Sequence, residues 1–268
     1  NQDSFSFCRI SDTLCYAVLC DGMGGENGGN VASELTVRDI GRELSAALGS
    51  DAEQKDLRTI MEQAISHANL VVNRAARDTE ALRGMGTTVV LAVAEGNTVT
   101  IAHAGDSRAY LIHGEELSQL THDHTVVQML MERGEITEEE ALSHPQRHYI
   151  TRAVGVDCEI RVEFSQAELG EGDAVLLCSD GLCHYTTWKE LHGLLMETDS
   201  REQLQQRLQT AVGFCRSCGE TDNITALALK WNDLSSLPSG TDDWIEVWAR
   251  LSGEAAPIEY DQKLGRIL

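Results

Sequence analysis

The residues of this chain best suited to chemistry are aspartates at the ends of apolar runs. Asp21 ends the run YAVLC and opens a glycine-rich stretch, DGMGGENGG. Asp180 ends a second apolar run in LLCSDG, and Asp222 precedes a third in ETDNITALAL. A single aspartate beside glycine is most often a turn residue. The repeated placement indicates a cluster of carboxylates, which repel one another unless cations neutralise them.

Two further aspartates extend this pattern, Asp106 in AGDSR and Asp3 in NQDS. The sequence has no HExxH motif and no two CxxC pairs that would supply zinc with nitrogen or sulfur ligands. An all-oxygen ligand set suits Mg²⁺ or Mn²⁺ instead. Two such ions about 3.5–4 Å apart can share a water and aim it at phosphorus for in-line attack.

The glycines after Asp21 indicate that the backbone itself approaches a bound group, because glycine otherwise weakens regular structure. The carbonyl of Gly22 can serve as an oxygen ligand, and the later glycines leave room for a phosphate. The stretch lacks the GKS or GKT of a P-loop. It also lacks the spacing and the βαβ context of a dinucleotide-binding fingerprint.

Composition limits the possible functions. The chain has 268 residues and a formal net charge of −22, which disfavours nucleic acid as a partner. No apolar run approaches the roughly 18 residues of a membrane span. Cys215 and Cys218 form a single CxxC, which we interpret as ordinary reduced cysteines, with a redox or metal role as the alternative. The natural compartment for eight reduced cysteines is the cytoplasm.

Apolar periodicity predicts the elements that position the aspartates. Short apolar runs predict strands over 16–20, 87–94, 98–104, 108–113, 174–179 and 224–231. Helical spacing predicts helices over 37–48 and 57–75, around 187–197, and over 201–213. Hairpin-joined strands with helices grouped in runs favour an α+β or layered α/β architecture. The segment 122–150 is predicted to be a small irregular insertion.

The composition changes after Trp231, where NDLSSLPSGTDD is typical of a linker. We therefore expect a catalytic domain over residues 1–231 and a C-terminal tail over 232–268. Four apolar residues of the tail recur at i, i+3, i+4 and i+7 and predict a short amphipathic helix: Trp244, Val247, Trp248 and Leu251. This helix is expected to pack on the domain, and the alternative is that it docks a partner protein.

Several motifs run in order from residue 1 to 231: NQDSF, VLCDGMGGENGGNVAS, GMGTTVVLAV, AHAGDSRAYLI, LTHDHT, HPQRHYITRAVG, LLCSDGL and ETDNITALAL. This series resembles the metal-dependent protein serine/threonine phosphatases of the 2C (PPM) family, in their bacterial form. The resemblance implies a four-layer αββα sandwich of two antiparallel sheets flanked by helix pairs. It also implies that a metal-bridging water hydrolyses phosphoserine and phosphothreonine. The implied partners are phosphorylated proteins, namely a serine/threonine kinase and its substrates.

The resemblance further implies a role for each carboxylate. Asp21 would bridge two Mn²⁺ or Mg²⁺ ions, and Gly22 would donate its carbonyl. Asp180 and Asp222 would ligate one metal, so that these two residues and Asp21 are the candidate catalytic residues.

The remaining two aspartates have weaker implied roles. Asp3 would hold metal-bound water, and Asp106 would bind a third, weaker metal. The insertion 122–150 corresponds to the flap that lies beside the site in this family.

The chain departs from the family pattern at a few positions. Gln2 replaces a glutamate, and Met23 stands where eukaryotic members carry a histidine proposed as general acid. Metal-bound water is the expected substitute, with His144 and His148 as weaker candidates. The phosphate-binding arginine is expected just upstream of Asn1, so the substrate-binding residues are unknown.

Two other functions share much of this reasoning. A pseudophosphatase is disfavoured because every expected metal-ligand aspartate is present. A small-molecule phosphoesterase would use the same chemistry, and only a panel of substrates separates it from a protein phosphatase.

Overall fold

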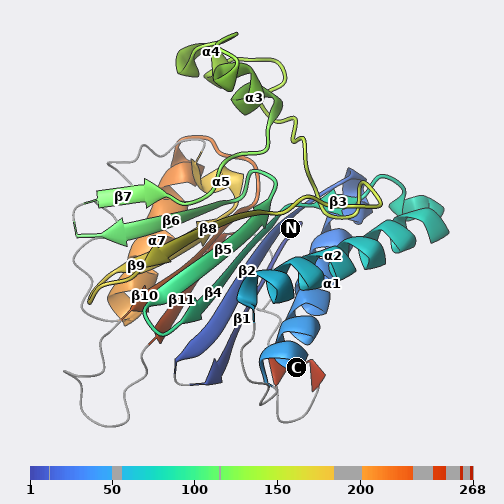
Figure 1. The fold of residues 1–268 in the computed structure, drawn as a ribbon. Helices are drawn as coiled ribbons and strands as arrows, with labels where there is room; N and C mark the ends of the chain where they lie inside the picture. The colour runs from blue at the N-terminus through green and yellow to red at the C-terminus, as the bar shows by residue number, and fades with distance from the viewer. Residues whose placement is uncertain are drawn as a thin grey trace.

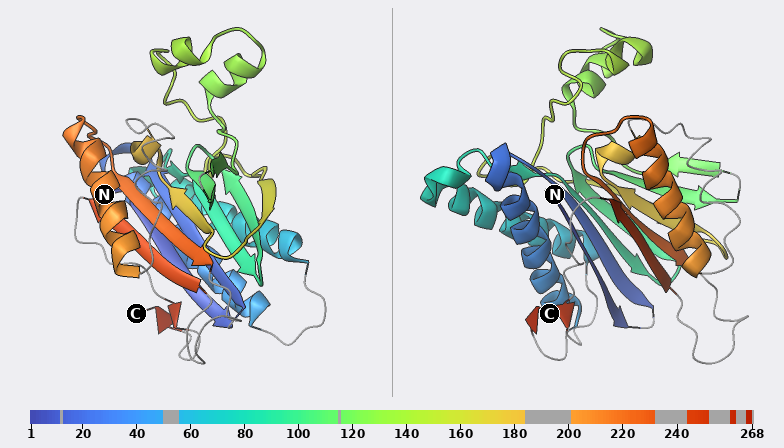
Figure 2. Two further views of the ribbon diagram at one scale, coloured as in Figure 1. Left: turned by 90° about the vertical axis from the view of Figure 1, so that its left-hand side faces the viewer. Right: turned by 180° about the vertical axis from the view of Figure 1, so that it is seen from behind.

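The computed structural model of the chain describes residues 1–11, 13–49, 56–114, 116–183, 201–231, 244–251, 260–261 and 266–267. Two antiparallel sheets pack face to face, and helices cover their outer faces (Figure 1, Figure 2). The expected α+β sandwich of two antiparallel sheets flanked by helices is therefore confirmed.

The first sheet is built mainly from the N-terminal half of the chain. Its strands follow the order β1-β2-β4-β5-β8, and β3 pairs with β2. Their bounds are β1 (Asp3–Ser11), β2 (Leu14–Met23), β3 (Gly86–Thr87), β4 (Val89–Glu95), β5 (Thr98–Ala104) and β8 (Glu163–Glu168). The helices on its outer face are α1 (Gly25–Leu48) and α2 (Leu57–Asp78), followed by a short 3₁₀ helix, η1 (Glu80–Leu82).

The second sheet follows the order β11-β10-β9-β6-β7. Its strands are β6 (Arg108–His113), β7 (Glu116–Gln119), β9 (Ala174–Cys178), β10 (Ile224–Trp231) and β11 (Trp244–Leu251). Helices α5 (Asp180–Cys183) and α7 (Arg201–Ser217) lie on its outer face, and β12 (Tyr260–Asp261) pairs with β13 (Arg266–Ile267).

Strand β2 shows why the central strands of the sandwich have nearly continuous apolar sequences. Val18 and Cys20 belong to the core under α1 and α2. The alternate residues Ala17 and Leu19 belong to the core between the two sheets. Because successive side chains of a strand point to opposite faces, a strand covered on both faces is apolar at every position.

The expected strands and helices within the described residues are confirmed, with one exception in the tail. The expected helix around 187–197 and the expected linker over 232–243 lie outside the described residues. Strands β1, β7, β8, β12 and β13 were not predicted from the sequence. Strand β8 (EFSQAE) is half-exposed and lies at the edge of its sheet, so its sequence is polar and carries little strand pattern.

The amphipathic helix expected in the tail is wrong. Residues Trp244–Leu251 form strand β11, which runs antiparallel to β10 from the pair Trp231–Trp244 to the pair Ile224–Leu251. The segment is rich in residues that favour strands, and an isolated helix of eight residues is only marginally stable in water. Pairing with an open sheet edge therefore outweighs the helical spacing.

The segment 122–150 leaves the sandwich at the end where α5 and β3 lie (Figure 1). It contains α3 (Val126–Glu132) and α4 (Glu138–Leu142). An isolated bridge between Thr125 and Ile150 closes its base. Among the described helices, none combines the length and the apolar character needed to cross a lipid bilayer.

Candidate metal centre

The two sheets place their aspartates at the same end of the sandwich. In the first sheet, the antiparallel register of β1 and β2 pairs Asp3 directly with Asp21. In the second, Cys178 of β9 pairs with Arg108 of β6 and with Ala226 of β10. Asp180 lies two residues beyond the end of β9. The antiparallel register therefore places Asp180 beside Asp106 and beside the start of β10.

Hydrogen bonds from the second sheet hold Asp3, which is only 2% exposed. Its Oδ2 accepts a hydrogen bond from Ser179 Oγ at 3.0 Å and another from Thr225 Oγ1 at 2.6 Å. Ser179 precedes Asp180, and Thr225 lies near Asp222. Asp3 therefore fixes the ends of the two sheets relative to each other.

Two threonines hold the backbone of Asp21. Its N–H donates to Thr88 Oγ1 at 2.9 Å, and its carbonyl accepts from Thr87 Oγ1 at 2.7 Å. Thr88 also lies 2.7 Å from Ser107 through the two hydroxyl oxygens. Because Ser107 follows Asp106, this contact links the Asp21 position to the Asp106 turn.

The charges of the cluster act on Asp21. Burial is the first cause that raises the pKa of the half-buried Asp21 well above its ordinary value. The remaining causes are the negative charges of four carboxylates: Asp3, Asp180, Asp106 and Asp222. The structure thus brings all five predicted aspartates together, and their role as ligands stays a prediction.

Asp106 experiences the same kind of environment. Burial, then the charges of Asp180 and Asp123, raises the pKa of Asp106 to about 7. A cation placed among these groups would reverse both shifts, because an opposite charge favours the ionised carboxylate. The donor set is made only of oxygen atoms and strongly negative, so it fits Mg²⁺ or Mn²⁺.

Gly22 lies where no larger residue fits. A Cβ atom at this position would lie 2.0 Å from the carbonyl oxygen of Gly29 and 2.7 Å from that of Gln2. The Gly22 N–H donates to the Gln2 carbonyl at 3.1 Å. The first turn of α1 therefore packs directly on the β2 backbone, and this close approach accounts for Gly22 and Gly29.

Sequence reasoning did not identify two stacked histidines behind the Asp106 turn. The ring centroids of His103 and His124 lie 4.8 Å apart with an angle of 3° between their planes. The Gly105 N–H donates to His124 Nδ1 at 3.2 Å, and the His124 N–H donates to the Gly105 carbonyl at 3.0 Å. These bonds fasten the start of the 122–150 segment to the turn that carries Asp106. A histidine in each of AHAGDSR and LTHDHT was the available sequence clue.

Glu163 and Arg152 complete the surroundings of His124. Nε2 of His124 lies 3.0 Å from Glu163 Oε2 and 2.8 Å from Arg152 Nη1. His103, His124 and Glu163 place potential ligand atoms close together. However, stacked rings cannot direct two in-plane lone pairs at one ion, and Arg152 adds a positive charge. Burial lowers the pKa of His124 to about 4, which fits a neutral structural imidazole.

A second group of potential ligands joins α1 to α2 and comprises Asp39, Glu43 and His67. The buried Asp39 carboxylate accepts a hydrogen bond from Arg42, and His67 Nδ1 lies 2.6 Å from it. Arg42 already supplies a cation there. We therefore assign this group to an interhelical ion-pair network.

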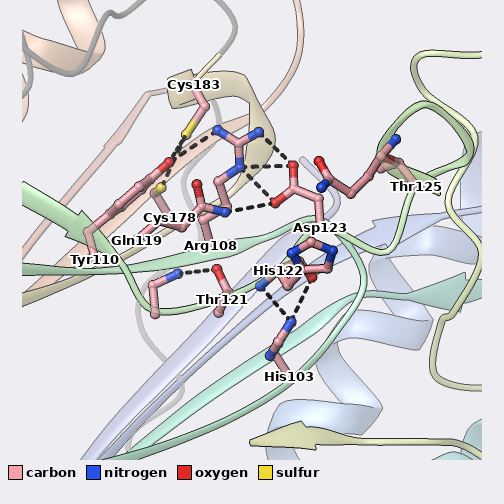
Figure 3. A network of polar contacts seen from close by, with 12 residues as sticks. His103, Arg108, Tyr110, Gln119, Thr121, His122, Asp123, Thr125, Cys178 and Cys183 are labelled. Atoms are coloured by element: carbon pink, nitrogen blue, oxygen red, sulfur yellow. Dashed lines mark hydrogen bonds and ion pairs between the residues drawn. The ribbon is translucent and has the colours of Figure 1, made fainter. Parts of the chain in front are cut away.

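Arg108 anchors the base of the 122–150 segment. Its Nε and Nη2 donate to both carboxylate oxygens of Asp123, at 2.9 Å and 2.6 Å (Figure 3). Gln119 adds a hydrogen bond to the same carboxylate at 3.1 Å. This paired geometry gives the projecting segment a rigid attachment beside the aspartates.

Comparisons with known proteins agree with this geometry. A sequence model of the family described as protein phosphatase 2C matches residues 1–213. The chain is 34% identical over 235 residues to the serine/threonine phosphatase stp of Listeria innocua, covering 87% of this chain and 90% of that protein. Its structure is similar to that of the S. agalactiae serine/threonine phosphatase, with a TM-score of 0.79, 32% identity, and coverage of 87% of this chain and 93% of the other. It is also similar to the catalytic domain of the serine/threonine protein phosphatase PstP in complex with 2 manganese ions, with a TM-score of 0.69, 32% identity, and coverage of 85% and 90%.

Proposed function

The chain belongs to the protein phosphatase 2C family and is a metal-dependent protein serine/threonine phosphatase, and from this premise we propose which of its residues hold the metal ions. In this proposal Asp21 would hold both ions, and the Gly22 carbonyl would be a further ligand. Asp180 and Asp222 complete one of the two ion sites. Phosphorylated proteins are the substrates.

The observation that carries this assignment is the convergence of four carboxylates on Asp21. A protein gains no stability from five acidic groups at one end of a sandwich, because each raises the pKa of its neighbours. Cations remove that cost. When bound, two Mn²⁺ or Mg²⁺ ions also supply the charge that acidifies an attacking water and stabilises the phosphoryl oxygens.

The outer aspartates have supporting roles in the proposal. Asp3, held by Ser179 and Thr225, orients a water near the ions. Asp106 would hold a third, weaker ion, as the family resemblance implies, and hydrogen bonds between Gly105 and His124 position the turn that carries it. This segment acts as a flap that shapes substrate access, since it projects from the end of the sandwich that carries the site (Figure 1).

The group that protonates the leaving alkoxide is proposed to be water at the site. Met23 has no proton to donate. His148 of the flap is exposed and His144 is half-buried, and both lie on the projecting segment. We expect phosphopeptides to react more slowly than aryl phosphates, whose leaving group needs no proton.

The wider setting is also proposed by analogy. A serine/threonine kinase and its substrates would supply the phosphorylated proteins, and the cytoplasm would be the compartment. The catalytic domain would comprise residues 1–231, with residues 232–268 as a C-terminal tail whose strand β11 adds to the sheet of that domain.

The proposal is tested by hydrolysis of a phosphothreonine peptide with Mn²⁺, Mg²⁺ or excess chelator. We expect turnover with metal and none after full chelation. Turnover that survives chelation would overturn the metal assignment, and metal binding without turnover would indicate a pseudophosphatase. A panel that adds small phosphate esters separates the remaining alternative, because a small-molecule phosphoesterase would prefer them to phosphopeptides.

A further inference from the structure

Two cysteines lie on either side of Asp180. Cys178 ends β9 and Cys183 ends α5, and their Sγ atoms lie 3.6 Å apart. Cys178 is fully buried and Cys183 is half-buried. Both are free thiols in the structure. The distance is already a van der Waals contact between sulfurs, so a bond between them requires only a small movement.

Cys183 lies in surroundings that favour a thiolate. Its Sγ lies 3.3 Å from the Tyr110 hydroxyl, which accepts a hydrogen bond from Arg108 Nη1 at 3.2 Å (Figure 3). The hydrogen bond with Cys178, the charge of Arg108 and the hydrogen bond with Tyr110 lower the pKa of Cys183, against the opposing effects of burial and of the Asp123 charge. A thiolate is the nucleophilic form of cysteine.

Other described cysteines differ from Cys183. Burial raises the pKa of Cys8, Cys20 and Cys215, which makes these thiols less reactive. Cys215 donates to the Leu182 carbonyl at 3.4 Å and behaves as a packed core thiol. Cys183 thus combines a partner sulfur, partial exposure and a nearby guanidinium.

We propose that Cys183 and Cys178 are a redox modification site, in which a hydroperoxide converts them to a reversible disulfide that alters the position of Asp180. The Cys183 thiolate attacks one peroxide oxygen, the O–O bond breaks, and hydroxide or alkoxide leaves, so that Cys183 becomes a sulfenic acid. The Cys178 sulfur then attacks the Cys183 sulfur and displaces hydroxide, which takes the Cys178 proton and leaves as water. The peroxide gains two electrons, and the two thiols lose them.

The disulfide would strain the segment that carries Asp180. An S–S bond is about 2.05 Å long, so the two sulfurs must approach each other by roughly 1.5 Å. Strand β9 is held on both sides by β6 and β10, so α5 is the element that moves. Its second residue, Gly181, packs so tightly that an added Cβ would lie 2.4 Å from the Asn223 carbonyl oxygen. A shift of α5 therefore also disturbs the backbone next to Asp222.

The disulfide itself does not depend on the proposed function, but its effect on activity rests on the proposed role of Asp180. Displacement of a catalytic group by about 1 Å can cost on the order of 100-fold in rate. We expect peroxide treatment to lower kcat by at least tenfold and to weaken Mn²⁺ binding. A dithiol reductant should restore both.

The first experiment detects the bond without reference to activity. The full chain is treated with hydrogen peroxide, alkylated, digested with trypsin and analysed by mass spectrometry. Residues 162–189 contain no internal lysine or arginine, so one peptide carries both cysteines. We expect it to lose a pair of hydrogen atoms and to escape alkylation. Recovery of that peptide with both thiols alkylated would overturn the proposal.

The second experiment uses variants. Cys183→Ser replaces a half-buried thiol with a hydroxyl of similar size and should keep the activity of the reduced protein while becoming resistant to peroxide. Cys218→Ser, a change at an exposed cysteine, is the matched control and should remain sensitive. Equal loss of activity in Cys183→Ser would place the oxidation elsewhere and contradict the proposal. Calorimetry should show weaker Mn²⁺ binding only in the oxidised protein.

These results separate the two proposals. A reduced protein without phosphatase activity would contradict the proposed function. The mass of the peptide would still show whether the disulfide forms. An active protein that forms the disulfide without losing activity or Mn²⁺ affinity would show that α5 does not carry a ligand in the way proposed.

Discussion

Asp21 is the residue on which the other charges of the site converge. Its backbone is fixed by Thr87 and Thr88, so it cannot move away from its neighbours. Its raised pKa has burial and four carboxylates as causes. Without a cation, the repulsion among these charges lowers the stability of the fold, and in the proposed assignment Asp21 is the central ligand of the metal site.

Replacing Asp21 should therefore separate activity from stability. We expect Asp21→Asn to lower kcat by at least about 100-fold, since loss of even an indirect partner of a metal costs 10–100-fold. The chelated variant should melt at the same temperature as the chelated parent or higher, because one repelling charge is gone. Phosphopeptide kinetics and thermal melts measure both quantities.

The control for this change is Asp78→Asn, which removes an exposed carboxylate at the end of α2. It should leave kcat unchanged. Near-normal turnover of Asp21→Asn under saturating Mn²⁺ would remove Asp21 from the metal site.

The raised pKa of Asp106 predicts that the stability of the metal-free protein depends on pH. Its pKa is about 7 in the folded chain, against an ordinary value of 3.8. Between these values the folded state binds more protons than the unfolded state. The free energy of unfolding therefore falls as the pH rises from about 4 through about 7. The loss is at most about 4 kcal/mol.

The measurement compares chelated parent and Asp106→Asn between pH 5 and pH 8. The variant should lose less stability over this range than the parent. The comparison is necessary because burial lowers the pKa of His103 and His124, and these groups oppose the trend. Parallel curves for the two proteins would show that Asp106 is not the titrating group.

At the scale of elements, the site depends on strand ends. Strands β1 and β2 supply Asp3 and Asp21, and the register between them determines that these residues face each other. The turn between β5 and β6 supplies Asp106. Strands β9 and β10 are central strands of the second sheet. Pairing with the strands on either side, β6 and β11, therefore also stabilises the strand ends that carry the site.

Strand β11 makes such a contribution to β10. Truncation after Trp231 removes the whole edge partner of β10 and exposes its backbone hydrogen-bonding groups. We expect the melting temperature to fall by at least about 5 °C, equivalent to roughly 2 kcal/mol for a chain of this size. Thermal unfolding of the two proteins measures this effect.

The matched control is truncation after Leu251, which keeps β11 and removes β12 and β13. It should have a smaller effect. Unchanged stability after truncation at Trp231 would mean that β11 does not pack in solution and would favour the alternative role of the tail as a docking segment.

At the scale of the whole molecule, the proposed metal centre lies across the two sheets. Asp3 and Asp21 belong to one sheet, whereas the turns and strand ends of the other sheet carry the remaining three aspartates. Ions bound among them would join the two layers of a chain with a net charge of −22. Metal binding should then stabilise the entire fold rather than a local loop.

We expect Mn²⁺ to raise the melting temperature in a concentration-dependent manner. At about 100 times Kd the gain is about 2.7 kcal/mol, which corresponds to roughly 5–10 °C for a chain of this size. A monovalent salt at equal ionic strength controls for general screening of the negative charge. An equal rise with the monovalent salt, or the same Mn²⁺ response in Asp21→Asn, would contradict a specific site.

Local sequence patterns determined much of this protein. Short apolar runs predicted most strands, helical spacing predicted α1, α2 and α7, and aspartates next to glycine indicated the candidate metal centre. These features depend on neighbours a few residues apart, and the sequence displays such relations directly. The resemblance of ordered motifs then indicated the family, which the comparisons confirmed.

Only the tertiary structure decided how distant segments meet. Trp244–Leu251 carries a spacing that fits a helix, yet the open edge of β10 makes it a strand. The stack of His103 on His124 and the contact between Tyr110 and Cys183 join residues from different elements. No local pattern encodes such contacts, because they depend on strand register and on the packing of two layers, which exist only once the whole chain has folded.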